Sequence, residues 1–166
     1  TYIVFFSDHG DMHGCHGQFK KTFAYEESIR IPFFIAGGPS PYANKRGRCD
    51  APINHVDIAP TTLGLCGLDV PETMQGADYS GCFLRGKDAP DAPDSAYIQS
   101  VVPTLHGNSY DQPWRGVVTR DNWKYVCTPG MPVMLYDLNE DPYEQVNLAQ
   151  NMRCQDVRRR LHERLA

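Results

Sequence analysis

The segment Tyr2-Ile3-Val4-Phe5-Phe6-Ser7-Asp8-His9-Gly10 indicates the fold class of this chain. It opens with five consecutive apolar residues rich in β-formers, and such a run without polar alternation is typical of a strand buried on both faces, as in a parallel sheet. A second run of this kind, residues 31–36, ends at Gly37-Gly38. Residues 21–29 can form a short helix, so the opening predicts a strand, connection, strand unit of an α/β domain. Two parallel strands do not make a stable sheet, so we expect further strands upstream.

The residues that follow this unit predict a loop, a helix and a linker. Residues 39–50 crowd Pro, Asn, Lys, Arg and Gly together, which is typical of an exposed loop. A helix should begin near Asp57, because Pro60 is tolerated only in a first turn. Residues 85–95 hold two prolines and several charges, and they predict a linker.

The second half changes to short apolar runs separated by turn signals. Four strands are expected at residues 96–102, 115–119, 123–127 and 133–136, with a hairpin at Asp121-Asn122. Strands that follow one another so closely predict a small four-stranded antiparallel sheet. Residues 152–165 place Val157, Leu161 and Leu165 four apart with arginines largely elsewhere, which predicts an amphipathic C-terminal helix with a solvated arginine face.

Composition limits the classes of partner. The 166 residues are 41% hydrophobic and carry 16 basic against 20 acidic side chains, a formal net charge of −4. We therefore expect a globular chain without a nucleic-acid partner. No apolar stretch is long enough to predict a membrane span. The chain opens inside an apolar run without an initiator Met, so we expect it to be a piece of a longer protein.

The six cysteines form neither a C-x-x-C pair nor a zinc-ligand spacing. We expect reduced, mostly structural thiols, and their even spread favours a reducing, cytoplasmic compartment only slightly. The compartment stays open.

Chemistry-bearing residues follow the first strand. Asp8 and His9 lie where ligands of open α/β sheets bind, beyond the carboxyl end of a strand. A carboxylate and an imidazole at adjacent positions can both turn toward one divalent ion, although an Asp-His pair in a loop is more often a turn with a capping carboxylate. Residues 9–21 then concentrate three histidines, three glycines and two lysines. This composition suits a metal and an anionic group bound together.

A series of motifs runs along the chain: S-D-H-G at 7–10, G-x-H-G at 14–17, K-x-x-x-Y-E-x-x-x-R-x-P at 21–32, N-H-V-D-I-A-P-T at 54–61, M-Q-G at 74–76, L-Y-D-L at 135–138, D-P-x-E at 141–144 and N-L at 147–148. These motifs resemble the signature block in the second half of sulfatases of the alkaline phosphatase superfamily, which related phosphonate monoester hydrolases share. They cover nearly the whole chain in the family's order.

The resemblance implies an architecture. Residues 1–84 would be the C-terminal part of an α/β catalytic domain with an alkaline-phosphatase-like parallel sheet. Residues 85–95 would be a linker, and residues 96–166 a small antiparallel-sheet subdomain with a C-terminal helix.

The resemblance also implies site residues. Asp8 and His9 match two metal ligands of the family, usually for Ca²⁺, with Mn²⁺ or Zn²⁺ as alternatives because imidazole also suits borderline metals. Lys21 matches the lysine that contacts the sulfate or phosphonate group, and His16 is a substrate or supporting group, or else structural. The remaining polar candidates are a solvent-facing Lys20, a His13 without a family role, a Glu26–Arg30 ion pair, and His55 and Asp57 as capping groups.

A decisive element is missing from these residues. The family's nucleophile is a formylglycine made from Cys or Ser in a C-x-P-x-R or S-x-P-x-R segment, and no such segment occurs in the sequence. We expect it upstream, together with two further aspartate ligands, so the chain alone should not turn over.

Three functions are therefore open. The resemblance implies a sulfuric ester hydrolase (sulfatase) acting on a sulfate ester. The first alternative is a phosphonate or phosphate ester hydrolase. The second is a non-catalytic interaction module, in which an exposed sheet edge pairs with a copy of itself as a homo-oligomer.

Overall fold

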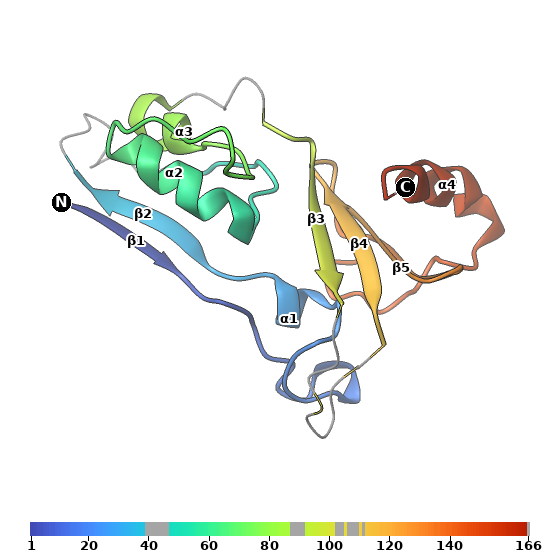
Figure 1. The fold of residues 1–166 in the computed structure, drawn as a ribbon. Helices are drawn as coiled ribbons and strands as arrows, with labels where there is room; N and C mark the ends of the chain where they lie inside the picture. The colour runs from blue at the N-terminus through green and yellow to red at the C-terminus, as the bar shows by residue number, and fades with distance from the viewer. Residues whose placement is uncertain (39–46, 87–91, 102–104, 106–109, 111, 166) are drawn as a thin grey trace. The chain divides into compact units, whose positions relative to one another are not determined.

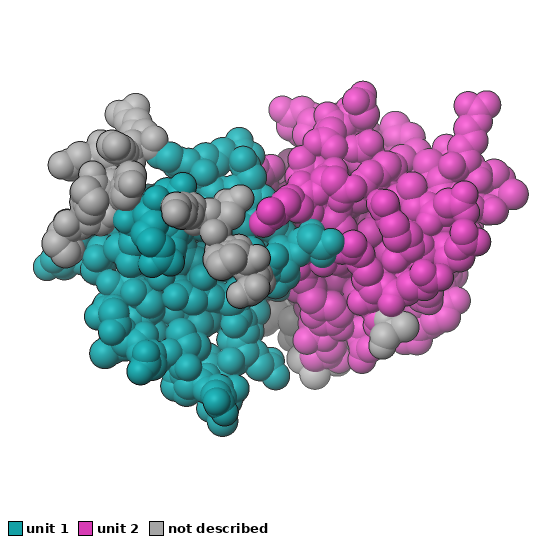
Figure 2. All heavy atoms as spheres, turned by 90° about the horizontal axis from the view of Figure 1, so that it is seen from above, with its two compact units in different colours: residues 1–8, 32–94 teal, residues 9–31, 95–166 magenta. Residues whose placement is uncertain are grey.

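The computed structural model describes residues 1–38, 47–86, 92–101, 105, 110 and 112–165. The chain divides into two compact units, coloured separately in Figure 2. Unit 1 consists of residues 1–8 and 32–94, and unit 2 of residues 9–31 and 95–166. The predicted division into residues 1–84, 85–95 and 96–166 stays a prediction. Most of the predicted loop at 39–50 and the middle of the predicted linker lie outside the described residues.

Unit 1 contains a two-stranded sheet whose strand direction differs from our prediction. β1 (Tyr2–Phe6) and β2 (Phe33–Gly37) both form where expected, but they pair antiparallel, with Tyr2 opposite Gly37. Continuous apolarity predicts burial and says nothing of direction. A parallel pair needs a crossover packed on the sheet, whereas here the connecting residues 9–31 fold into unit 2 and the chain returns along β1 in the opposite sense.

The two strands are also not buried on both faces. Ile3, Phe5 and Phe34 are exposed, and the rings of Phe5 and Phe34 stack with centroids 4.6 Å apart. The helices α2 (Ile58–Leu65) and α3 (Ser80–Arg85) lie on the other side of the sheet (Figure 1). One face of this small sheet is therefore apolar and uncovered.

The helix near Asp57 forms as predicted, and the aspartate has the capping function that we expected. Its carboxylate accepts from the backbone N–H of Asn54 at 2.7 Å and of Ala77 at 2.8 Å. With the Asn54 side chain it forms a capping box on the 3-10 turn η2 (His55–Asp57), which continues into α2. The M-Q-G turn needs its glycine, because Gly76 has φ 96° and a Cβ there would meet the Val56 carbonyl oxygen at 2.2 Å.

Unit 2 contains the predicted antiparallel sheet. Its strands are β3 (Ser95–Ser100), β4 (Trp114–Thr119), β5 (Trp123–Thr128) and β6 (Met131–Asp137), in the order β3-β4-β5-β6. The hairpin between β4 and β5 lies at Asp121-Asn122, where Asn122 has φ 62°. Asn tolerates this left-handed conformation better than most residues, which explains its position in the turn.

The predicted C-terminal helix covers one face of this sheet. It consists of the 3-10 turn η3 (Met152–Cys154) and α4 (Gln155–Glu163), and its Leu161 is fully buried. Leu161 joins Val117, Tyr125 and Leu135 in the main core. Burial of these apolar groups holds α4 on the sheet.

Residues 9–31 contribute to a second core in the same unit. This segment contains the 3-10 turn η1 (Cys15–Gly17) and the short helix α1 (Glu26–Ile29). Ala24 packs with Trp114 and Val126, whose side chains alternate with those of the α4-facing set along β4 and β5. Figure 1 shows α1 and α4 on opposite sides of the strands. Three of the residues predicted to do chemistry, His9, His16 and Lys21, are therefore carried by a segment fixed to the sheet of unit 2, whereas Asp8 belongs to unit 1.

Candidate active site

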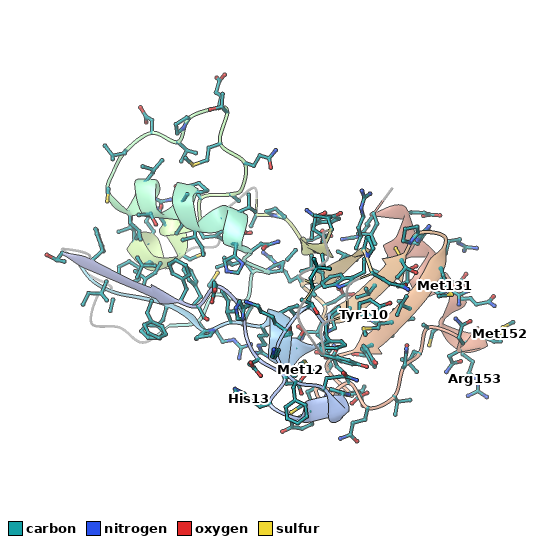
Figure 3. The ribbon with its side chains drawn as sticks, turned by 60° about the horizontal axis from the view of Figure 1, so that its bottom comes forward. Met12, His13, Tyr110, Met131, Met152 and Arg153 are labelled. Atoms are coloured by element: carbon teal, nitrogen blue, oxygen red, sulfur yellow. The ribbon has the colours of Figure 1, made fainter. Side chains whose placement is uncertain are left out.

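Backbone hydrogen bonds hold the segment of residues 9–31 together as a loop. Gly10 N–H donates to the Ser28 carbonyl at 2.8 Å, Met12 N–H to the Lys20 carbonyl at 2.7 Å, and Gly14 N–H to the Gln18 carbonyl at 2.8 Å. Met12 is fully buried inside this loop, and Figure 3 labels it beside its neighbour His13. These bonds make an ordered loop between Gly10 and Ser28.

The loop contains unusual backbone conformations. His13, His16, Lys20 and Thr22 all have φ between 46° and 87°, and only three other non-glycine residues of the described part have positive φ. Such conformations are costly for residues with a Cβ and persist where the surroundings fix them, often at functional sites. Thr22 is fixed in this way, because its carbonyl accepts from Trp114 Nε1 at 2.9 Å and its hydroxyl oxygen accepts from the Tyr110 N–H at 2.6 Å.

Two of the predicted site residues contact each other. Lys21 Nζ lies 2.7 Å from His9 Nε2, and His9 Nδ1 lies 2.7 Å from the Gly10 carbonyl oxygen. One tautomer satisfies both contacts: Nδ1 carries the proton and donates to the carbonyl, while Nε2 accepts from the Lys21 ammonium. A ligating histidine commonly donates its other ring N–H to a carbonyl in this way. In this tautomer His9 Nε2 keeps a lone pair, which is the kind of donor that a borderline divalent metal accepts.

Asp8 belongs to unit 1, at the end of β1. Its Oδ1 lies 3.4 Å from the Ser7 hydroxyl oxygen, and the Ser7 carbonyl in turn lies 3.1 Å from His55 Nε2. His55 thus contacts the backbone beside Asp8 and also has its N–H bound to the Asn54 side chain at 2.7 Å. The predicted pairing of Asp8 with His9 on one metal stays a prediction.

His16 has protein partners on two sides. Its ring stacks on the Tyr25 ring with centroids 3.9 Å apart and 8° between the planes, and its Nε2 lies 3.8 Å from Glu27 Oε1. Because stacking fixes the ring plane, His16 is held in one orientation. His13, in contrast, has a side chain that is 84% exposed, and its Nδ1 lies 3.4 Å from Asp11 Oδ1.

Below the loop lies a buried charge cluster that sequence reasoning missed. Lys124 on β5 is completely buried, and its ammonium contacts the carboxylates of Glu144 and Glu26, the latter at 3.1 Å. Glu144 Oε2 also accepts from the Glu26 backbone N–H at 2.7 Å. Burial raises the pKa of Glu144 above its usual range, and the Lys124 ammonium opposes that rise. The expected Glu26–Arg30 pair forms at 3.9 Å, but Arg30 is exposed, so Lys124 is the stronger partner.

The strand pattern gave no signal for a buried Lys124. Lys124 lies between Trp123 and Tyr125 in a strand, a position that pattern analysis assigns to a solvated face. Both faces of the sheet in unit 2 are covered, so this lysine is buried and requires counter-charges. The D-P-x-E motif supplies one of them at Glu144.

One further group of ligand types comes together in the described part of the chain. His16, Glu27 and Glu144 each offer an atom within 4.8 Å of the others. Glu144 already neutralises Lys124, which gives the cluster its own cation. We therefore interpret this group as a structural support of the loop.

Comparisons with known proteins agree on the family. The family described as N-sulphoglucosamine sulphohydrolase, C-terminal, matches residues 14–166. An ulvan-active sulfatase of Formosa agariphila is 37% identical over 150 residues, which are 89% of this chain and 28% of that protein.

Solved structures agree as well. One protein, solved in complex with its substrate D-glucosamine-2-N,6-O-disulfate, has a TM-score of 0.80 at 28% identity, over 99% of this chain and 33% of its own. The phosphonate monoester hydrolase of Agrobacterium radiobacter has a TM-score of 0.81 at 27% identity, over 99% of this chain and 34% of its own.

This chain thus spans about a third of the length of the proteins that it matches. Within the described residues, no helix has the length and apolarity needed to cross a bilayer. From the match over residues 14–166, the chain belongs to the N-sulphoglucosamine sulphohydrolase C-terminal family and corresponds to the C-terminal portion of a sulfatase.

Proposed function

We propose that this chain is the C-terminal portion of a sulfuric ester hydrolase and supplies part of its catalytic site. The observation that carries the proposal is the direct contact between Lys21 and His9, 2.7 Å apart. Separate sequence motifs suggest Lys21 as a contact of an anionic group and His9 as a metal ligand. Their meeting on one ordered loop is what a shared site for the two would require.

In the intact enzyme, His9 and Asp8 would hold a divalent metal, with Ca²⁺ as the first choice and Mn²⁺ or Zn²⁺ as alternatives. When bound, such an ion supplies Lewis-acid stabilisation of charge on the ester oxygens. The Gly10 carbonyl keeps the proton of His9 on Nδ1, and this leaves the Nε2 lone pair for ligation.

Lys21 would bind the sulfate group. Its ammonium cannot remain on His9 Nε2 when that nitrogen binds a cation, so it would turn to an anionic oxygen of the ester. There it stabilises the negative charge that grows on the oxygens in the transition state. His16 would act by keeping the loop in place, since Tyr25 and Glu27 fix its ring.

The nucleophile has to come from another part of the protein. The sequence contains no C-x-P-x-R or S-x-P-x-R segment, and the related sulfatase is more than three times as long as the matched region. We propose that the preceding part of the protein supplies a formylglycine and further metal ligands. The chain alone would then be inactive.

A second candidate is a phosphonate or phosphate ester hydrolase. The structural similarity to the Agrobacterium radiobacter enzyme favours it as a rival, because tetrahedral sulfur and phosphorus present the same oxygens to a lysine and a metal. A third candidate, a non-catalytic module, is favoured by the exposed Ile3, Phe5 and Phe34.

The test is a comparison of hydrolysis rates for sulfate monoesters and a phosphonate monoester by the intact protein. We expect sulfate release with the higher kcat/KM, and a fall of about 10²-fold or more in Lys21→Ala, because one charge-stabilising group is lost. The control is His13→Ala, an exposed neighbour on the same loop, which should keep its rate. Faster phosphonate cleavage would favour the second candidate, and no hydrolysis of any ester would favour the third.

A further inference from the structure

Two cysteines of unit 1 lie in direct contact. Cys49 Sγ lies 3.2 Å from Cys82 Sγ, although the two residues are 33 positions apart in the sequence. Both residues are partly exposed. The sequence alone gave no reason to pair these two among the six.

The two sulfur atoms are carried by different elements. Cys82 lies in α3, where its N–H donates to the Tyr79 carbonyl and its own carbonyl accepts from Gly86. The ring of the next residue, Phe83, meets the Tyr2 ring edge to face at 6.0 Å, so α3 is anchored on β1. Cys49 lies outside any helix or strand, between Arg48 and Asp50, whose side chains form an ion pair at 2.6 Å.

This contact needs little movement to become covalent. A disulfide joins its sulfur atoms at about 2.0 Å and demands that the two Cβ vectors already face each other. The sulfur atoms of Cys49 and Cys82 are already only 3.2 Å apart. Because Cys49 lies outside any helix or strand, we expect its side chain, rather than α3, to move when the bond forms.

We propose that Cys49 and Cys82 form a disulfide site that cross-links unit 1. The oxidant is a low-molecular-weight disulfide such as oxidised glutathione. The thiolate of one cysteine attacks a glutathione sulfur and releases one glutathione thiol; the second cysteine then attacks the mixed disulfide and releases the other. Two protein thiols and one glutathione disulfide thus become one protein disulfide and two glutathione thiols.

The cross-link would tie α3 to the start of the segment that carries the Asn54–Asp57 capping box and α2. The bond closes a long loop of the unfolded chain, and such loops gain most from closure. We expect oxidation to raise the melting temperature of the protein by about 5 °C or more. The inference does not depend on the proposed function, because it concerns no residue of the candidate active site.

The test is thiol mapping of the intact protein after equilibration in glutathione redox buffer and blocking of remaining thiols with N-ethylmaleimide. Trypsin alone cannot report the bond, because residues 49–85 contain no Lys or Arg before Arg85 and hold three cysteines. Trypsin with a glutamate-specific protease separates residues 49–72 from residues 73–85. Without reduction these two peptides should stay joined, and dithiothreitol should release them.

Cys66 shares the first peptide with Cys49, and its replacement gives the matched control. Cys66→Ser should keep the joined peptides, whereas Cys49→Ser and Cys82→Ser should each lose them. Circular dichroism in dithiothreitol checks that the variants fold. Maleimide on both Cys49 and Cys82, or separate glutathione adducts on the two, would overturn the proposal, as would a bond that survives in Cys49→Ser.

Discussion

The ammonium of Lys21 lies 2.7 Å from Nε2 of His9, so two residues twelve positions apart share one polar contact on the loop of unit 2. A strained backbone surrounds them: Lys20 and Thr22, on either side of the lysine, both have positive φ. Because the surroundings fix this conformation, the lysine is directed at the histidine rather than left to solvent. The contact suggests that a metal at His9 and the Lys21 ammonium compete for one lone pair.

Lys21→Met should therefore tighten metal binding while it impairs turnover. Removing the ammonium removes both a hydrogen bond to Nε2 and a like charge near the ion, together worth about tenfold in metal affinity. Calorimetric titration of the chelator-treated intact protein with Ca²⁺ and Mn²⁺ measures the effect. Lys20→Met, at the neighbouring exposed position, serves as the control and should bind as the wild type does. Weaker metal binding in Lys21→Met would contradict the competition.

The buried Lys124–Glu144 pair should behave as a coupled unit. Lys124→Met leaves a carboxylate buried without its counter-charge, so the free energy of unfolding should fall by about 3–5 kcal/mol. The double variant Lys124→Met, Glu144→Gln should recover part of this loss, because no uncompensated charge remains. Urea unfolding of the single and double variants gives the coupling.

A surface ion pair provides the contrast for that cycle. Arg159 and Asp156 lie 2.8 Å apart with side chains 72% and 88% exposed. Arg159→Ala should change the free energy of unfolding by only about 0.5 kcal/mol or less. A loss at Lys124 no larger than this would show that the buried cluster does not support the loop.

Asp141 should make stability depend on acid pH. Its carboxylate accepts from the N–H groups of Gln145 and Val146 at 3.0 and 2.8 Å, and these bonds lower the pKa of Asp141 below its ordinary value of 3.8. A carboxyl with a lowered folded-state pKa stabilises the fold above the unfolded value, and this contribution is lost as pH falls through the folded pKa. In Asp141→Asn, unfolding free energy should fall less steeply below about pH 4 than in the wild type. Equal slopes would mean that these bonds do not discriminate between the charged and neutral carboxyl.

The uncovered face of β1 and β2 should make the isolated chain associate. Ile3, Phe5 and Phe34 are exposed together, and a contiguous apolar patch on a small sheet is typical of an interface. Sedimentation of the 166-residue chain should show concentration-dependent association, reduced in Phe5→Ser, Phe34→Ser. Val101→Ser, an exposed apolar residue of unit 2, is the control. If the chain stays monomeric at all concentrations, the exposed face of β1 and β2 is not an interface for a second copy of the chain.

Much of the fold follows from local patterns in the sequence. The strands of unit 2 form where they were predicted because Tyr125 and Leu135 alternate with residues of the opposite face, and α4 forms because Leu161 repeats at helical spacing. The direction of β1 against β2 could not be predicted in this way. It depends on where residues 9–31 fold, and no property of the two apolar runs encodes that.

The candidate site, too, was predicted from the sequence only in part. Asp8, His9, His16 and Lys21 could be named from motifs, and the contact of His9 with Lys21 agrees with a common site. Lys124 was missed, because a lysine in a strand ordinarily indicates solvent. Only the packing of two covered sheet faces shows that this one is buried and bound to Glu26 and Glu144.

Calorimetric titration of Ca²⁺ into the chelator-treated intact protein and its Asp8→Ala and His9→Ala variants measures whether these two residues bind the metal. We expect saturable binding in the wild type that both variants lose or weaken by about 10²-fold, while His13→Ala binds normally. Binding that survives unchanged in both variants would contradict the assignment of Asp8 and His9 as metal ligands.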